Sequence, residues 1–74
     1  MTTYRMIEIV GTSKESFEDA IKNGIRDARE MLQDSVSTLE GYEWFQVIDQ
    51  RGSMKDGEIE EFQIRLNVGF RINK

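Results

Sequence analysis

The sequence predicts an α+β fold of order β-α-β-β, with a three-stranded antiparallel sheet wrapped around one helix. The strongest observation is the alternation of apolar and polar residues over residues 62–72, which is typical of a strand. Apolar and small residues in steps of three and four after residue 13 define one helical stripe. Two shorter alternating stretches, residues 3–10 and 44–50, complete the pattern, and a turn from Gly52 to Gly57, with Asp56-Gly57 as its tight-turn signal, precedes the last strand. We predict the strand order one-three-two and a single domain over residues 1–74.

The residue types exclude several classes of function. The 74 residues include 10 basic and 14 acidic side chains, for a net charge of −4, with no His, Cys or Pro. The acidic balance argues against a nucleic-acid partner. Without His and Cys there is no Ser-His-Asp triad, thiol nucleophile or thiolate zinc site, so an enzyme is disfavoured. A domain this short without disulfides needs very good packing or oligomerisation.

The chain shows no segment that would direct it to a membrane. No apolar run approaches the ~20 residues needed to cross a bilayer. The first residues alternate and contain no apolar core of a signal peptide. We therefore expect a cytoplasmic protein without a membrane partner.

The predicted helix has a defined start and two alternative ends. Thr12 opens a capping box with Glu15, and Ser13 is an equally good cap. The apolar stripe continues to Leu39, and a helix from Ser13 to Glu40, stopped by Gly41, would be ~42 Å long. An end near Asp34 is the alternative, because the longer helix would overhang strands of eight residues.

The two later strands place the single tryptophan on the far side of the sheet from the helix. Phe62, Ile64, Leu66 and Val68 form the face that the helix should cover, and Phe45 and Val47 should join it. Alternation then sends Trp44 to the opposite face together with Gln63, Arg65 and Arg71. We expect the indole and the Gln63 carboxamide to emerge side by side there. A large aromatic side chain on that face needs another subunit or a flat ligand.

Three segments together resemble the dodecin family of small flavin-binding proteins. They are IEIVGTSKESFEDAI, WFQVIDQRG with its Q-R-G motif, and GEIEEFQIRLNVGFR, and they cover nearly the whole chain. The resemblance implies a β-α-β-β subunit in a hollow homododecamer. It also implies that two flavins stack between tryptophans of neighbouring subunits, for storage and buffering of flavin rather than for turnover.

Carried over by position, the resemblance implies roles for five residues. Trp44 matches the flavin-stacking tryptophan, and Gln63 matches the glutamine that reads the polar edge of the isoalloxazine ring. Asp49 matches a position near the ribityl chain, and Arg51 matches one that contacts the flavin phosphate. Arg71 matches a basic position implicated in a separate coenzyme A site. The implied ligand is FMN, riboflavin or FAD, with coenzyme A as a possible second ligand.

One segment departs from the family pattern, and one alternative function stays open. The stretch before Trp44 is about two helical turns longer than in the family, with the added residues around Leu32 to Gly41. They would either lengthen the helix or form a loop near the pocket mouth. The alternative is a structural or calcium-binding oligomer without flavin. An acidic cluster in the last predicted turn could bind a divalent cation, although a solvated hairpin explains it better: Asp56, Glu58, Glu60 and Glu61.

Overall fold

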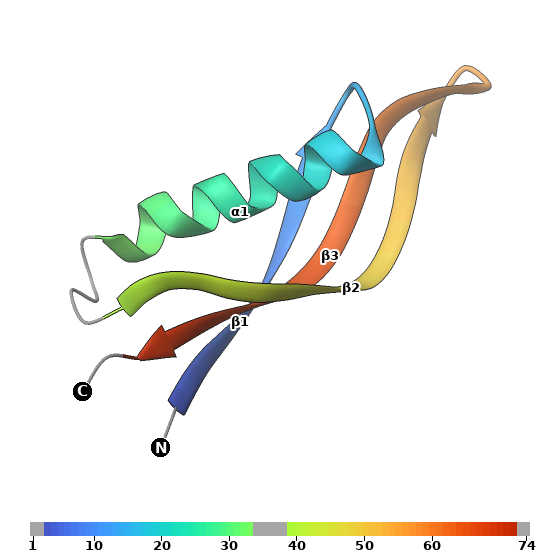
Figure 1. Cartoon of the computed structure of the whole chain (residues 1–74). Helices are drawn as coiled ribbons and strands as arrows, with labels where there is room; N and C mark the ends of the chain where they lie inside the picture. The colour runs from blue at the N-terminus through green and yellow to red at the C-terminus, as the bar shows by residue number, and fades with distance from the viewer. Residues whose placement is uncertain (1–2, 34–38, 73–74) are drawn as a thin grey trace.

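The computed structural model describes residues 3–33 and 39–72 and shows the predicted α+β fold (Figure 1). Its elements are β1 (Thr3–Ser13), α1 (Phe17–Gln33), β2 (Leu39–Lys55) and β3 (Glu58–Ile72). The three strands form one antiparallel sheet of order β1-β3-β2, which confirms the predicted order. The helix α1 is not long and apolar enough to span a membrane, and it is the one helix among the described residues.

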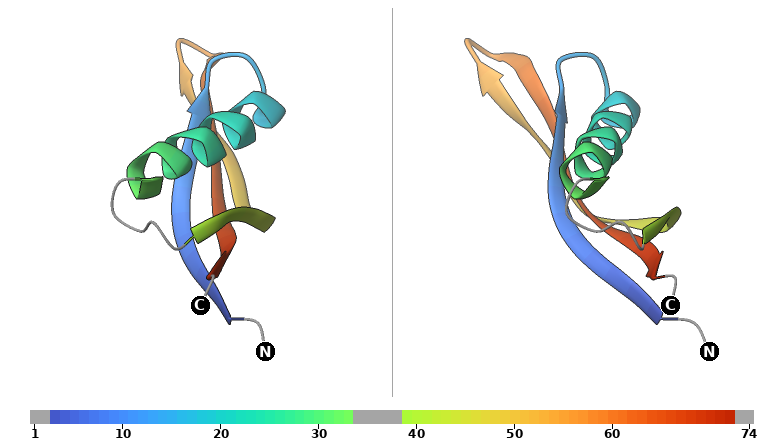
Figure 2. Two further views of the ribbon diagram at one scale, coloured as in Figure 1. Left: turned by 60° about the vertical axis from the view of Figure 1, so that its left-hand side comes forward. Right: turned by 90° about the vertical axis from the view of Figure 1, so that its left-hand side faces the viewer.

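The central strand β3 supplies most of the core. The helix lies on one face of the sheet (Figure 2). Residues of β3 alternate between this inner face and the outer face, which turns away from α1. Four inner-face side chains are at most 2% exposed: Ile64, Leu66, Val68 and Phe70. The predicted apolar stripe of this strand is therefore the core of the domain.

The helix lies against β1 through two glycines. A Cβ atom built on Gly11 would collide with the carbonyl oxygen of Ala20 and lie 3.0 Å from Gly24 Cα. A Cβ on Gly24 would likewise lie 3.0 Å from Gly11 Cα. Ala20 and Ala28 are also buried on this side of the helix. Small residues at the crossing let the helix backbone approach the strand closely.

The helix begins later than predicted, at Phe17, because a different serine caps it. Ser16 Oγ accepts a hydrogen bond of 3.0 Å from the backbone N–H of Asp19, as an N-cap residue does. Ser13 remains in β1 and caps the preceding turn, where its Oγ accepts from Glu15 N–H at 2.8 Å. Its hydroxyl also donates to Asp19 Oδ2 at 2.6 Å. The predicted box of Thr12 with Glu15 is therefore wrong.

The helix ends at Gln33, so the prediction that it reaches Glu40 is wrong and the earlier end is close to the observed one. Residues 34–38, which include Asp34, lie outside the described residues. Leu39, Glu40 and Gly41 belong to β2. This part of the added segment extends the sheet and not the helix.

The β2–β3 hairpin is longer than predicted and has a tighter turn. Only Asp56 and Gly57 lie between the strands, with φ of 53° and 80°. Positive φ at both central residues is the signature of a type I′ turn, which matches the twist of the strands. The predicted turn from Gly52 to Gly57 shrinks to these two residues. The hairpin tip projects beyond the start of α1 (Figure 1).

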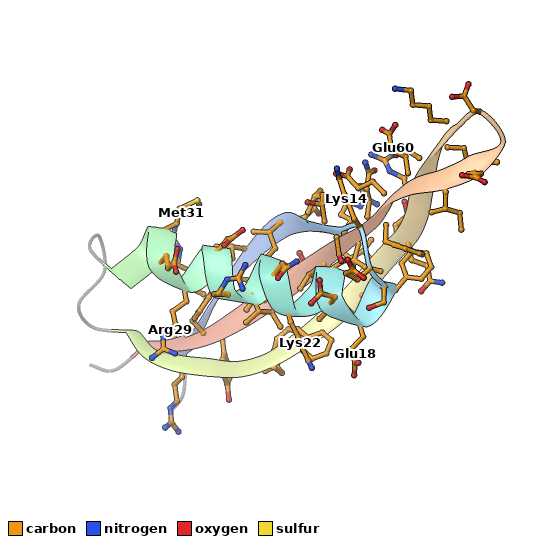
Figure 3. All side chains as sticks on the ribbon, turned by 90° about the horizontal axis from the view of Figure 1, so that it is seen from above. Lys14, Glu18, Lys22, Arg29, Met31 and Glu60 are labelled. Atoms are coloured by element: carbon orange, nitrogen blue, oxygen red, sulfur yellow. The ribbon has the colours of Figure 1, made fainter. Side chains whose placement is uncertain are left out.

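Strand β2 is left largely uncovered by the helix. Phe45 and Val47 pair with the core residues Val68 and Leu66, so they share the inner face. They nevertheless remain 48% and 39% exposed. The prediction that they join this face is confirmed, but the helix does not cover them, because α1 packs over β1 and β3 (Figure 2). The charged side chains Glu18, Lys22 and Arg29 line one side of the helix (Figure 3).

Candidate functional site

The outer face of the sheet carries all five residues to which the resemblance assigns a ligand contact. The pairing register places Trp44 opposite Gly69, Asp49 opposite Arg65, and Arg51 opposite Gln63. Arg71 lies opposite Tyr4 of β1. Since odd-numbered residues of β3 from Gln63 onward turn away from the helix, these partners lie on the outer face.

A bulge in β2 is needed to bring Asp49 and Arg51 to this face. Strict alternation from Trp44 would put both residues on the inner face, beside Phe45 and Val47. The register shifts between Val47 and Asp49, which leaves Ile48 as the extra residue. The shift returns Asp49 and Arg51 to the face that holds Trp44. Apolar and polar alternation alone does not reveal such a bulge.

At one end of the outer face, an aromatic cluster of Tyr4 and Trp44 rests on Gly69. A Cβ atom at Gly69 would lie 2.6 Å from Trp44 Cε2 and 2.8 Å from Nε1, so the indole lies directly on the strand backbone. The Tyr4 ring meets the indole edge-on, with centroids 6.5 Å apart and planes at 62°. Trp44 remains 39% exposed and lies away from α1, as predicted.

At the other end, a polar cavity of about 200 Å³ opens on the same face. Its lining residues come from all three strands: Val10, Asp49, Arg51, Gln63 and Arg65. Within it, Arg51 Nε donates a 2.8 Å hydrogen bond to Gln63 Oε1. Gln63 Nε2 in turn donates to Glu61 Oε1 at 2.9 Å. Three of the predicted residues are therefore neighbours in the folded chain.

Sequence reasoning gave no role in the cavity to Arg65. Its guanidinium lines the cavity and lies 4.0 Å from the Glu8 carboxylate in an exposed ion pair. Its position on the outer face of β3, two residues from Gln63, could have identified Arg65 as a site residue. Together with Arg51 it makes the cavity suitable for an anionic group, since guanidinium groups pair well with phosphate.

The expectation that Trp44 and Gln63 emerge side by side is wrong within one chain. They share the outer face, but Gly69, opposite Trp44, is six residues from Gln63 along β3. At about 3.3 Å per residue the separation is about 20 Å. A tricyclic ring seated on Trp44 would have to span most of that distance to reach Gln63 of the same chain. Arg71 lies near the aromatic cluster, at the opposite end of the face from Arg51.

The acidic hairpin does not form a metal site in the described residues. No group of three or more Asp or Glu side chains is arranged there to hold a metal ion. Lys55 lies opposite Glu58 beside the two-residue turn.

Comparison with known proteins places the chain in a family. The Dodecin family model matches residues 3–73. Dodecin of Thermus thermophilus is 37% identical over 71 residues, which cover 96% of this chain and 93% of that protein. The structure of dodecin from Streptomyces davaonensis superposes with a TM-score of 0.83 at 40% identity, covering 99% and 97% of the two chains. For dodecin from Streptomyces coelicolor the TM-score is 0.74 at 33% identity, covering 99% and 94%. The chain belongs to the dodecin family.

Proposed function

We propose that this protein binds FMN or riboflavin on the outer face of its sheet and serves to store and buffer flavin as a homododecamer. The observation that carries the proposal is the position of Trp44. Its indole lies on Gly69, half-exposed, on the sheet face that the protein's own helix leaves bare. The family relationship and the implied role of Trp44 support the same reading.

The chemistry of the aromatic cluster suits a flat, electron-poor ring. The indole is the most electron-rich aromatic side chain, and offset stacking contributes about 1 kcal/mol beyond burial. Stacks of nucleic-acid bases on aromatic side chains contribute about 1–3 kcal/mol. Electron transfer from the indole to the excited flavin would quench its fluorescence. We propose binding and not turnover, in keeping with the family relationship.

The separation of Trp44 from Gln63 implies that each flavin lies between two chains. In a two-fold pair of outer faces, the aromatic cluster of one chain can meet the polar cavity of its partner, and the reverse contact forms by symmetry. Exposed apolar side chains on this face favour such an association, since an uncovered apolar patch marks an interaction surface. They are Tyr4 (45%), Met6 (47%), Val10 (53%) and Trp44 (39%).

The positions of Asp49, Arg51 and Arg71 are compatible with the roles that the family resemblance implies for them. Asp49 lies in the cavity beside Arg51, where it would contact the ribityl hydroxyls while Arg51 holds the phosphate of FMN. Arg71 lies at the far end of the face, which suits a separate site such as that for coenzyme A. FAD would have to extend its adenosine beyond the cavity.

Titrating the protein into FMN while recording flavin fluorescence tests the proposal. We expect strong quenching that saturates near one flavin per chain. The variant Trp44→Ala should abolish the quenching, because it removes both the stacking surface and the electron donor. Circular dichroism and size-exclusion chromatography show whether that variant keeps its fold and assembly. Unchanged fluorescence at excess wild-type protein would contradict flavin binding and leave the structural oligomer.

A further inference from the structure

The carboxamide of Gln63 is held between two charged side chains that determine which way it faces. Arg51 Nε can only donate, so the atom that it meets at 2.8 Å is the amide oxygen. The Glu61 carboxylate accepts at 2.9 Å, so the atom that it meets is the amide nitrogen. Rotating the amide by half a turn would set donor against donor and acceptor against acceptor.

These two contacts leave a defined part of the amide unused. A glutamine carboxamide has two N–H donors and two oxygen lone pairs. Arg51 takes one lone pair and Glu61 takes one N–H. One donor and one acceptor remain. This pattern complements the edge of a cyclic imide, in which a ring N–H stands next to a carbonyl.

We propose that Glu61 and Arg51 are positioning residues that fix the Gln63 carboxamide so that it reads the imide edge of the flavin ring. This inference rests on the proposed function and assigns a role to Glu61, which the sequence motifs leave unexplained. It also gives Arg51 a function that does not depend on a phosphate. The guanidinium uses Nε for Gln63, and its terminal nitrogens are separate donors.

The test compares riboflavin with 3-methylriboflavin, in which a methyl group replaces the ring N–H. Neither ligand has a phosphate and both carry the same ribityl chain, so a change in their ratio in the Arg51 variant points to Gln63. We expect the wild-type protein to prefer riboflavin by about tenfold or more, the value of a well-oriented hydrogen bond in a buried site. Glu61→Met and Arg51→Met should each reduce that preference to about threefold or less, chiefly by weakening riboflavin binding.

Two further variants separate positioning from a general structural effect. Glu61→Gln keeps a carbonyl acceptor toward the amide nitrogen and should retain the preference. Glu60→Met removes the neighbouring carboxylate, labelled in Figure 3, and should also leave the preference unchanged. Loss of stability alone would weaken both ligands equally and leave their ratio intact.

The possible failures are distinguishable. If the wild-type protein binds neither ligand and does not quench FMN fluorescence, the proposed function fails. If it binds riboflavin and discriminates, but Glu61→Met and Arg51→Met keep the full preference, only the positioning role is overturned. If the wild-type protein binds both ligands equally, Gln63 does not read the imide edge and the inference is overturned as well.

Discussion

Replacing Gly11 by alanine should lower the free energy of unfolding by about 3 kcal/mol, the upper range for overpacking a tight contact. The added Cβ would collide with the Ala20 carbonyl oxygen, which is backbone and cannot rotate away. The helix would have to move away from β1. The β3 side chains that it now buries would then become partly exposed. Urea unfolding at a fixed protein concentration, followed by circular dichroism, measures the change.

Two comparisons show whether the close approach of helix and strand is the cause. Thr12→Ala, on the neighbouring exposed position, should change stability by no more than about 0.5 kcal/mol. Gly24→Ala gains about 1 kcal/mol of helix propensity, yet it should still be destabilising because its Cβ meets Gly11 Cα at 3.0 Å. A Gly11→Ala protein as stable as the wild type would contradict the packing described for α1 and β1.

Replacing Gly69 by alanine should weaken flavin binding by about ten- to a hundredfold, the loss of one stacking interaction. The new Cβ would lie 2.6 to 2.9 Å from three atoms of the Trp44 ring. Unlike the carbonyl that opposes Gly11, the indole is a side chain and can swing away. The fold should therefore persist while the stacking surface is lost. Riboflavin titration and the intrinsic tryptophan emission report the two effects separately.

The matched control for Gly69→Ala is Asn67→Ala, two residues earlier on the same strand and the same face. It adds no atom beneath the indole and should bind riboflavin within about threefold of the wild type. If Gly69→Ala and the wild type bind riboflavin equally, the flavin does not stack on a Trp44 indole that lies on Gly69.

Those features of the fold that depend on periodicity could be predicted from the sequence. The alternation through Ile64, Leu66 and Val68 identified the buried strand and its core face, and the Asp56-Gly57 pair identified the hairpin turn. The helix start was misplaced because Thr12, Ser13 and Ser16 are all good capping residues. Which of them caps depends on how far β1 pairs with β3, and that pairing continues to Ser13.

The candidate site was harder to derive because it depends on pairing between strands. The register shift at Ile48 moves Asp49 and Arg51 from one face to the other, and nothing in the local pattern of β2 signals it. The distance between Trp44 and Gln63 likewise follows from which residue of β3 each one meets. Residue types and a family resemblance named the residues, but only the register places Trp44 and Gln63 at different ends of the outer face.

The most direct test of the account is complementation between two defective chains. Trp44→Ala and Gln63→Ala proteins are unfolded together in equal amounts, refolded, and titrated with riboflavin at concentrations too low to fill sites in either variant alone. If the indole and the carboxamide on each ring come from different chains, half of the two-fold pairs are mixed and each holds one intact site. About one quarter of wild-type quenching should then return. Quenching no greater than that of the separately refolded variants would contradict a site shared between chains.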